Sequence, residues 1–326
     1  MITPIKTAPV FKQYIWGGSA LKDKYNKNIQ DNFAAESWEI SCHKDGMSLV
    51  AEGEFAGKTL NEVVMSDKEN MLGDAGMEQF PLLVKLLDAN DNLSVQVHPD
   101  DEYAKVNENG SLGKTEMWYV IDAKPGAKLV YGLRNGVTKQ QFADAIEQGT
   151  LEELLNYVPV KPGDAFFIPS KTLHAIGSGL LIAEIQQSSN TTYRVYDYNR
   201  TDASGNKREL HTAKALDVTS LEDVEGCERV VPVPYAAEGA KAGVISCCEF
   251  FAVIKYELDG KTTILPPAKR FEMLVCTEGC AKLGYNGGVM DINAGDSVFI
   301  PAALGAYTLE GSGDILRSFV PADGEF

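Results

Sequence analysis

A glutamine and a histidine stand two residues apart in the stretch LSVQVHPDDEYA, which begins at Leu93. Successive side chains of a β-strand point to opposite faces of the sheet, so Ser94, Gln96 and His98 share one face. The other face takes the apolar residues Leu93, Val95 and Val97. The sequence therefore predicts a strand whose apolar face packs in a core and whose polar face points toward something other than the apolar core.

Two further potential metal ligands follow along the chain. Glu116 stands eighteen residues after His98 in GKTEMWYV, and His174 follows the turn GDAFFIP. A lone histidine on a strand is more often a structural residue than a ligand, but the four residues together, each on a predicted strand or strand end, can meet at one interior point. Two imidazoles, a carboxylate and an amide oxygen suit zinc or a similar divalent ion, with positions left open for water or substrate. We therefore predict one metal per chain, held by Gln96, His98, Glu116 and His174.

Three basic residues occur near these segments. Lys85 lies inside the apolar run PLLVKLLD, where a buried ammonium group needs an anion or a carboxylate. Lys114 precedes Glu116 by two residues and shares its strand face, and Arg194 lies in TTYRVYD. Each of the three has a structural alternative. Lys85 can be an edge lysine whose ammonium group reaches solvent, Lys114 can lie at a solvated strand end, and Arg194 can form a surface ion pair. Together the three cations favour a site that receives a phosphate and an enediolate.

The elements that must position these residues are mostly strands. Short alternating or β-branched runs recur between turn residues, as in LLVKLLD, MWYVIDA, KLVYGL and LLIAEIQQ. Helices are few. Thr59 with Glu62, Thr138 with Gln141, and Thr150 with Glu153 have the spacing of capping boxes. We expect the helical segment at about 138–157 to be an insertion in a β domain.

An internal repeat divides the chain. VKPGDAFFIPSKTLHAI, from Val160, matches INAGDSVFIPAALGAYT, from Ile292, and Glu116-Met117 has a counterpart in Glu272-Met273. A linker rich in Pro, Ala and Gly lies between the copies, which predicts a catalytic domain at 1–237 and a second domain at 238–326. His174 aligns with Ala306, and the second copy has no histidine, so we expect it to be metal-free and structural, and to close the outer wall of the site.

Composition excludes several classes of protein. The chain has 326 residues and a formal net charge of -16, which disfavours nucleic acid as a partner. An anionic substrate would need a local group of cations on this acidic molecule. No segment reads as a signal peptide or a membrane span, and the six cysteines include no C-x-x-C pair. We expect a cytoplasmic protein that acts on a small molecule.

Three stretches together resemble a known family, the type I mannose-6-phosphate isomerases in their short bacterial form. They are LLVKLLDANDNLSVQVHPDDEYA, GKTEMWYV and IPSKTLHAIGSGLLIAEIQQSSNTTYRVYDYNR. The resemblance implies two cupin-type jelly-roll β-barrels, the first with a small helical insertion. It also implies zinc on the four predicted ligands, Arg194 and Lys114 as catalytic residues, and a substrate site that includes Lys85, Ser94 and Trp16. Longer relatives often have a tyrosine two residues after the histidine, where this chain has Ile176, so that residue's role does not carry over.

The implied reaction interconverts mannose 6-phosphate and fructose 6-phosphate through a cis-enediol. A metal can polarise the carbonyl and hydroxyl oxygens, Lys114 can carry a proton, and Arg194 can either stabilise the enediolate or anchor the phosphate. We favour the first role for Arg194, with Lys85 near the phosphate. The residues do not identify the catalytic base, and the chain can be a monomer or a weak homo-oligomer.

Two other classes of function compete with this one. A cupin-type metal oxygenase uses a similar His/Glu shell, but the glutamine ligand and the three nearby cations disfavour it. A non-catalytic sugar-binding protein would need no metal. Oxygen uptake separates the first alternative from an isomerase, and metal content separates the second.

Overall fold

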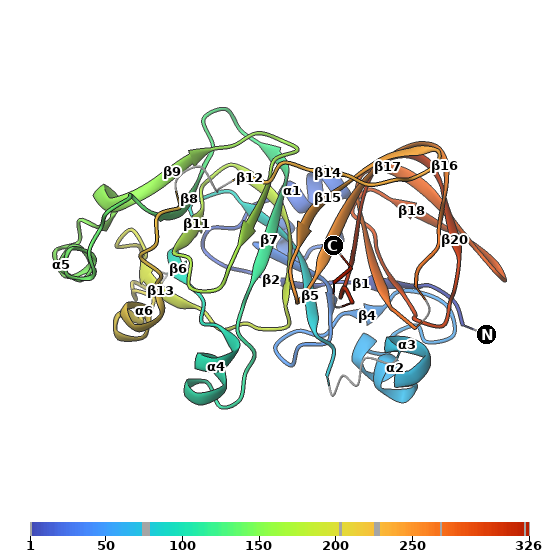
Figure 1. Cartoon of the computed structure of the whole chain (residues 1–326), viewed down its shortest axis with the longest axis horizontal. Coiled ribbons are helices and arrows are strands. Elements are labelled where there is room, and N and C mark those ends of the chain that lie inside the picture. Colours follow the sequence, from blue (N-terminus) through green and yellow to red (C-terminus); the bar gives the residue numbers. More distant parts are fainter. Residues whose placement is uncertain are drawn as a thin grey trace.

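The computed structural model describes residues 2–73, 79–201, 204–224, 229–267, 269–322 and 324–325. The protein is mostly β, as the sequence predicts, and two groups of strands lie side by side (Figure 1). In the described residues these strands form sheets of nine, six and five strands. Within the same ranges, every helix is too short or too polar to cross a membrane.

The N-terminal half contains two antiparallel sheets that enclose a shared apolar cluster. In spatial order the first contains β10 (Ala165–Ile168), β7 (Glu116–Ala123), β12 (Leu180–Gln187), β5 (Leu82–Ala89), β3 (Glu36–Ser41) and β2 (Val10–Lys12). The second contains β13 (Tyr193–Tyr196), β6 (Val95–Val97), β11 (His174–Ile176), β8 (Lys128–Leu133) and β9 (Leu155–Pro159). The cluster between them includes Leu87, Trp118, Leu129 and Ile176.

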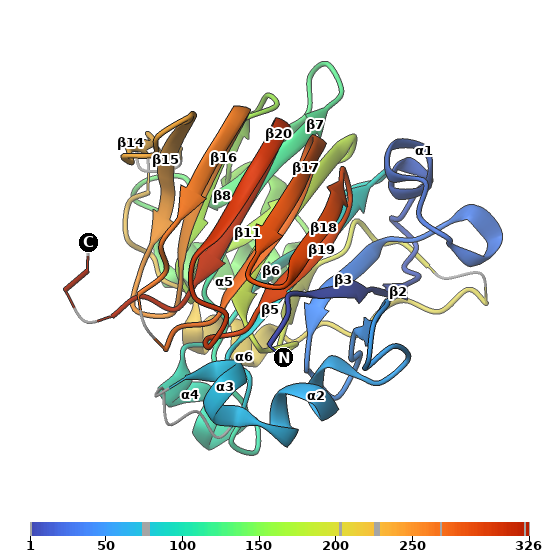
Figure 2. The same ribbon diagram turned by 90° about the vertical axis from the view of Figure 1, so that its right-hand side faces the viewer.

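The C-terminal half contributes most of the nine-stranded sheet, which faces the viewer in Figure 2. Its path runs through β14 (Val233–Pro234), β15 (Ala240–Cys247), β16 (Ala252–Ile264), β20 (Tyr307–Phe319), β17 (Glu272–Tyr285), β19 (Ser297–Ile300), β1 (Ile5–Ala8) and β4 (Leu49–Val50), and β18 (Gly288–Asn293) pairs with β17. Strands β1 and β4 come from the start of the chain, so the limits of this sheet do not coincide with the division expected near residue 237.

Glycines let the long strands of this sheet approach one another closely. Gly279 on β17 has a φ of +73°, and a Cβ there would lie 2.0 Å from the backbone oxygen of Ser312. A Cβ on Gly313 of β20 would lie 2.0 Å from the backbone oxygen of Glu278. The register of β17 against β20 shifts between Cys276 and Glu278, next to this contact. A larger residue at either glycine would force the strands apart where they bend.

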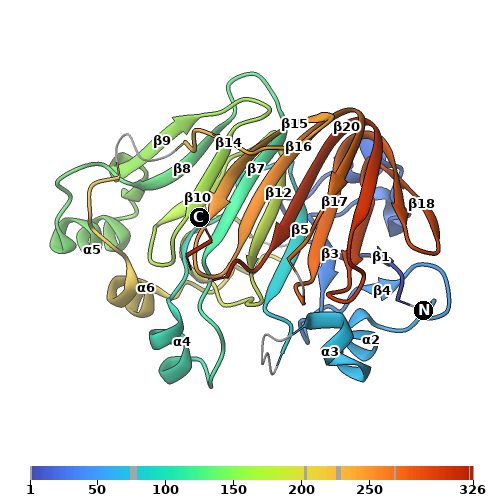
Figure 3. The same cartoon turned by 45° about the vertical axis from the view of Figure 1, so that its right-hand side comes forward.

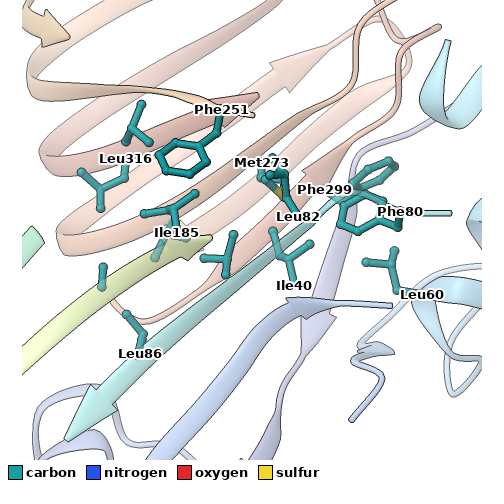
Figure 4. Packing of buried hydrophobic residues seen from close by; sticks show 14 of the residues in the cluster. Ile40, Leu60, Phe80, Leu82, Leu86, Ile185, Phe251, Met273, Phe299 and Leu316 are labelled. Atoms are coloured by element: carbon teal, nitrogen blue, oxygen red, sulfur yellow. The ribbon is translucent and has the colours of Figure 1, made fainter. Parts of the chain in front are cut away.

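The two halves pack through the outer faces of their large sheets, whose strands lie next to one another in Figure 3. Figure 4 shows the contact: Leu82, Leu86 and Ile185 of the N-terminal half meet Phe251, Met273, Phe299 and Leu316 of the C-terminal half. All of these side chains are buried. Burial of this apolar area stabilises the arrangement of the halves.

The helices lie outside the sheets. They are α1 (Ala20–Tyr25), α2 (Leu60–Ser66), α3 (Lys68–Leu72), α4 (Asp101–Asn107), α5 (Lys139–Gln148) and α6 (Thr212–Val218), with 3₁₀ turns η1 (Gln30–Asn32) and η2 (Leu151–Leu154). The capping boxes of Thr59 and Thr138 are present. The predicted third box is wrong: Thr150 makes no side-chain cap, because the turn it precedes is a short 3₁₀ turn. The predicted insertion thus consists of α5, η2 and the start of β9.

The insertion covers the outer face of the five-stranded sheet. Phe142 of α5 and Leu151 of η2 pack in one cluster with Val95 and Val97 of β6. The alternation predicted for this strand is therefore confirmed at its centre. Leu93 differs, because it precedes β6 and packs in the inner cluster instead. The polar face of β6 is left to point between the two sheets.

The internal repeat is visible in the strand pairing. Glu116 of β7 lies opposite Ile168 of β10, and Glu272 of β17 lies opposite Ile300 of β19. Both isoleucines belong to the shared Gly-Asp-x-x-Phe-Ile-Pro motif. The two glutamates therefore occupy corresponding positions in the two halves.

Candidate metal and substrate site

Gln96 is the centre of a row of three side chains across the five-stranded sheet. It lies opposite His174 of β11 on one side and opposite Arg194 of β13 on the other. Side chains that are paired across neighbouring strands point to the same face. Tertiary pairing thus brings two predicted ligands and the predicted arginine onto one surface.

The six-stranded sheet supplies the opposite wall. Glu184 of β12 lies opposite Lys85 of β5 and Trp118 of β7, and Gln186 lies opposite Glu116. The strand period of two places Glu116, like Trp118, on the inner face of β7. The carboxylates and the lysine therefore face the glutamine and histidines across the interior.

His98, Glu116 and His174 form a compact buried group in which one ligand atom from each lies within 4.8 Å of the others. Each histidine Nδ1 lies 2.8 Å from a backbone carbonyl oxygen, that of Thr191 for His98 and that of Thr172 for His174. Each carbonyl accepts a hydrogen bond from Nδ1–H. The proton therefore stays on Nδ1, and the lone pair of each Nε2 points toward the group. The two Nε2 atoms are 3.1 Å apart.

The geometry of this group fits a divalent cation. Two imidazole lone pairs that face each other at this distance need a shared positive partner, and no described residue donates a well-directed hydrogen bond to either buried oxygen of Glu116. Burial, together with Lys114, lowers the pKa of His174 to about 3 and keeps it neutral. The Gln96 amide lies 3.4 Å from His174 Nε2, and the opposite amide orientation would present its oxygen to the same point.

The charge of Glu116 depends on what lies next to it. Burial and the neighbouring Glu184 raise its pKa to about 8, so the carboxylate needs cations to stay ionised near neutral pH. One cation is Lys114, whose Nζ lies 2.6 Å from Glu116 Oε2 and 3.2 Å from His98 Nε2. Lys114 therefore touches the ligand group directly.

Two buried lysines are balanced by carboxylates along this wall. Lys85 Nζ lies 3.2 Å from Glu184 Oε1 and 3.4 Å from Glu36 Oε2, and Lys114 Nζ lies 3.7 Å from Glu184 Oε1. Although burial opposes it, Lys114 and Lys85 lower the pKa of Glu184 to about 2. Glu184 is therefore the ionised link between the two ammonium groups, and it explains how Lys85 is tolerated inside an apolar strand.

A cavity of about 250 Å³ opens in front of these groups. Every predicted substrate or catalytic residue lines it, and so does the predicted ligand Gln96: the set is Trp16, Lys85, Ser94, Gln96, Lys114 and Arg194. The other lining residues are Tyr14, Glu36, Leu87, Leu93, Glu184, Asn190, Thr192 and Arg208. The cavity wall, as far as the chain is described, contains no residue of the C-terminal half, so the expectation that this half closes the outer wall is wrong. Its sheet packs behind the site instead.

Arg194 is half-buried at the side of the cavity. Its Nε donates to Ser94 Oγ at 3.3 Å, and its Nη1 donates to the backbone oxygen of Glu209 at 2.8 Å. Trp16, in contrast, is almost fully buried and stacks on Tyr14 with 5.7 Å between ring centroids. Trp16 thus belongs both to the apolar cluster and to the cavity wall.

Sequence reasoning missed three charged residues of this site: Glu36, Glu184 and Arg208. Glu184 had a signal, because it interrupts the apolar run LLIAEI just as Lys85 interrupts PLLVKLL. Glu36 and Arg208 had none of comparable strength. Arg208 lies outside the strands, and its position depends on how the segment after β13 folds back.

Comparisons with known proteins agree with this geometry. Residues 5–127 match the family model described as phosphomannose isomerase type I, catalytic domain, and residues 242–320 match that of the mannose-6-phosphate isomerase cupin domain. The second match confirms the predicted cupin architecture. The second model covers the second copy of the repeat, whereas the first model includes Glu116 and ends before the turn motif of the first copy, which begins at Val160.

Full-length relatives are similar over nearly the whole chain. The probable mannose-6-phosphate isomerase GmuF of Bacillus subtilis is 42% identical, with 98% of this chain and 99% of that protein covered. Mannose-6-phosphate isomerase ManA of the same organism is 41% identical, covering 97% of this chain and 98% of that protein. The crystal structure of the mannose 6-phosphate isomerase from Bacillus subtilis superposes with a TM-score of 0.91 at 38% identity, covering 97% of this chain and 99% of that one. The chain therefore belongs to the type I phosphomannose isomerase family.

Proposed function

We propose that this protein interconverts mannose 6-phosphate and fructose 6-phosphate. The observation that carries the proposal is the contact of Lys114 with the buried His98–Glu116–His174 group on the wall of a polar cavity. Aldose–ketose isomerisation needs a group that moves a proton beside one that polarises neighbouring oxygens. The names of the full-length relatives support the same reaction. The family assignment gives no support to the oxygenase or the sugar-binding alternative.

The reaction requires no net gain or loss of atoms. In the open-chain aldose the C2 proton is removed, the electron pair forms a cis-enediol, and a proton returns at C1 while a hydroxyl proton passes from O2 to O1. Lys114 Nζ, as the neutral amine, is the group best placed to take the proton from C2 and return it to C1, because it lies on the cavity wall and touches the ligand group. Glu184 and Glu116 balance its charge while the proton moves.

Zinc is the ion that we propose for the site, one per chain, held by Gln96, His98, Glu116 and His174. Nitrogen and oxygen ligands of this kind, with positions left for substrate, are typical of catalytic zinc. When bound, such an ion acts as a Lewis acid on the carbonyl and hydroxyl oxygens. The single negative charge of the ligand set leaves the site net positive, which favours an enediolate.

Arg194 acts, in this proposal, on the negative charge that develops during the reaction. It lies beside Gln96 in the sheet and holds a planar set of donors at the cavity wall. Ser94 holds the Arg194 side chain through its hydroxyl oxygen. Tyr14, stacked on the buried Trp16, supplies an aromatic surface on which a sugar can rest.

The division of labour between the halves is also a proposal. Residues 1–237 would carry the catalysis, and residues 238–326 would form a metal-free domain that supports the six-stranded sheet from behind. The cavity lining and the apolar contact between the sheets support it. The scarcity of cysteine pairs and the acidic charge are consistent with a cytoplasmic enzyme that binds a small phosphosugar rather than nucleic acid, as a monomer or weak homo-oligomer.

A coupled assay that follows fructose 6-phosphate formation tests the function directly. We expect turnover of mannose 6-phosphate under anaerobic conditions, loss of turnover after chelation, and recovery when zinc is returned. Comparison of zinc with other divalent ions in the recovery step identifies the preferred metal. Oxygen consumption, or sugar binding without turnover in the metal-loaded protein, would contradict the proposal.

A further inference from the structure

Two groups of cations line the cavity, and they differ in how their charge is balanced. Lys85 and Lys114 form ion pairs with Glu36, Glu116 and Glu184. Arg194, in the described part of the chain, has no carboxylate within ion-pair distance, and its hydrogen bonds go to the neutral oxygens of Ser94 and Glu209. The lysines already have their counterions inside the protein, so an anionic ligand gains more from Arg194 than from either lysine.

Arg208 is the second arginine of the cavity wall. Its Nε donates to Asp197 Oδ2 at 2.7 Å, and its Nη2 donates to Asp197 Oδ1. This two-point contact fixes the plane of the guanidinium group. The hydrogen bonds of the described residues leave Nη1 without an acceptor, so that edge of Arg208 remains able to bind a ligand.

Asp197 does not neutralise this region. The carboxylate is almost fully buried and is shared with Arg200, whose Nη2 lies 2.6 Å from Oδ1. Arg200 also pairs with Asp91 at 3.0 Å. Burial lowers the pKa of Arg194, and the positive charge of Arg208 lowers it further, which agrees with two like charges held close to each other. A protein with a formal net charge of -16 thus keeps a local excess of positive charge at one part of its cavity.

We infer that Arg208, held in place by Asp197, binds the phosphate group of the substrate and makes the enzyme selective for phosphorylated sugars. The inference rests on the proposed function and adds to it a residue that the sequence did not indicate. A phosphate dianion suits a guanidinium group whose orientation is fixed in advance, because little side-chain freedom is lost on binding. Lys85 is less suited to this role, since two carboxylates, Glu36 and Glu184, hold its ammonium group, whereas Arg208 shares the single carboxylate of Asp197 with Arg200.

The role predicts a particular kinetic signature. The phosphate does not change during isomerisation, so its contact contributes equally to the bound substrate and to the transition state. Loss of that contact raises KM for mannose 6-phosphate while kcat is retained. It leaves the kcat/KM for unphosphorylated mannose unchanged, because mannose never makes the contact.

The test uses the metal-loaded full chain and the variant Arg208→Gln. We expect KM for mannose 6-phosphate to rise about ten- to hundredfold, the usual effect of losing a hydrogen bond to a charged group, with kcat within about threefold of the wild type. The Ki of inorganic phosphate as a competitive inhibitor should rise in parallel. Arg208→Lys, which keeps the charge but not the fork, should give an intermediate KM and guards against misfolding of the first variant.

Lys207→Gln is the matched control. It removes the same charge from the adjacent position, but Lys207 is exposed, contacts Asn199 and does not line the cavity. Its KM should stay at the wild-type value. An equal rise of KM in both variants, or a fall of kcat without a rise of KM in folded Arg208→Gln, overturns the inference.

Calorimetry with inorganic phosphate separates this inference from the proposed function. Phosphate binding that weakens in Arg208→Gln supports the phosphate site even if the wild type fails to isomerise mannose 6-phosphate. If the wild type isomerises mannose 6-phosphate and Arg208→Gln leaves both phosphate binding and KM unchanged, the phosphate site is refuted and the proposed function stands.

Discussion

Arg317 and Glu272 form a buried ion pair in the C-terminal half, at the position that corresponds to Glu116 in the N-terminal half. Arg317 Nε donates to Glu272 Oε2 at 2.8 Å, and the hydroxyl of Tyr307 donates to the same oxygen at 2.7 Å. The matching pairing of both glutamates with the isoleucine of the repeat motif establishes the correspondence. In the second copy, Arg317 and Tyr307 thus provide hydrogen bonds to the carboxylate of Glu272. In the first copy, the corresponding carboxylate of Glu116 points at the two histidines.

Glu272→Gln should leave the turnover per folded molecule nearly unchanged and lower the stability. The substitution leaves the Arg317 guanidinium buried without its counterion, and breaking such a pair typically costs about 3–5 kcal/mol. Urea denaturation with activity measured on the folded protein checks both parts. A large loss of turnover in a variant of normal stability would show that the second copy takes part in catalysis.

Glu116→Gln should lose the metal and the activity together, because it removes the only charged ligand of the predicted set. Elemental analysis of the freshly purified wild type should give one tightly bound ion per chain, and the variant should give almost none. Two tightly bound ions in the wild type, or a metal-loaded inactive variant, would contradict the assignment.

Arg194→Ala should lower kcat and retain the metal. A donor that stabilises charge formed only in the transition state typically contributes about a hundredfold or more to kcat. Steady-state kinetics at saturating mannose 6-phosphate, with metal content as the control, measures this. If kcat stays near normal and only KM rises, Arg194 anchors the phosphate together with Arg208.

Asp197→Asn should destabilise the protein by about 1–3 kcal/mol at pH 7, the usual effect of removing a buried carboxylate from charged, partly buried partners. Although burial opposes it, hydrogen bonds from Arg208 and Arg200 hold the pKa of Asp197 below its ordinary value of 3.8. Because its pKa is lower in the folded state, ionised Asp197 stabilises the fold at pH values above its unfolded-state pKa. This contribution is lost as the pH falls through the folded-state pKa. The stability difference between wild type and variant should therefore narrow below about pH 4 in urea titrations. A difference that is constant from pH 7 to pH 3 would contradict the assignment.

Local rules in the sequence predicted which residues belong to the site and which strand face each of them occupies. The strand period of two put Gln96 and Ser94 opposite the apolar Val95 and Val97, and the structure has that alternation. A charged residue in an apolar run marked Lys85 as buried, since a strand between two packed layers exposes no side chain to water. The repeat placed Glu116 and Glu272 at equivalent positions. Each of these inferences depends only on neighbours within a few residues or on the internal comparison.

Long-range pairing decided which of these residues meet. The sequence does not state that β6 lies between β11 and β13, and that arrangement alone puts His174, Gln96 and Arg194 in one row. The same holds for β1 and β4, which leave the N-terminal half and join the C-terminal sheet. Arg208 lies outside the strands, and it meets Asp197 only because the chain after β13 folds back toward the cavity. Such contacts depend on the packing of the whole chain, where many local patterns are compatible with several pairings, and only the tertiary structure selects one.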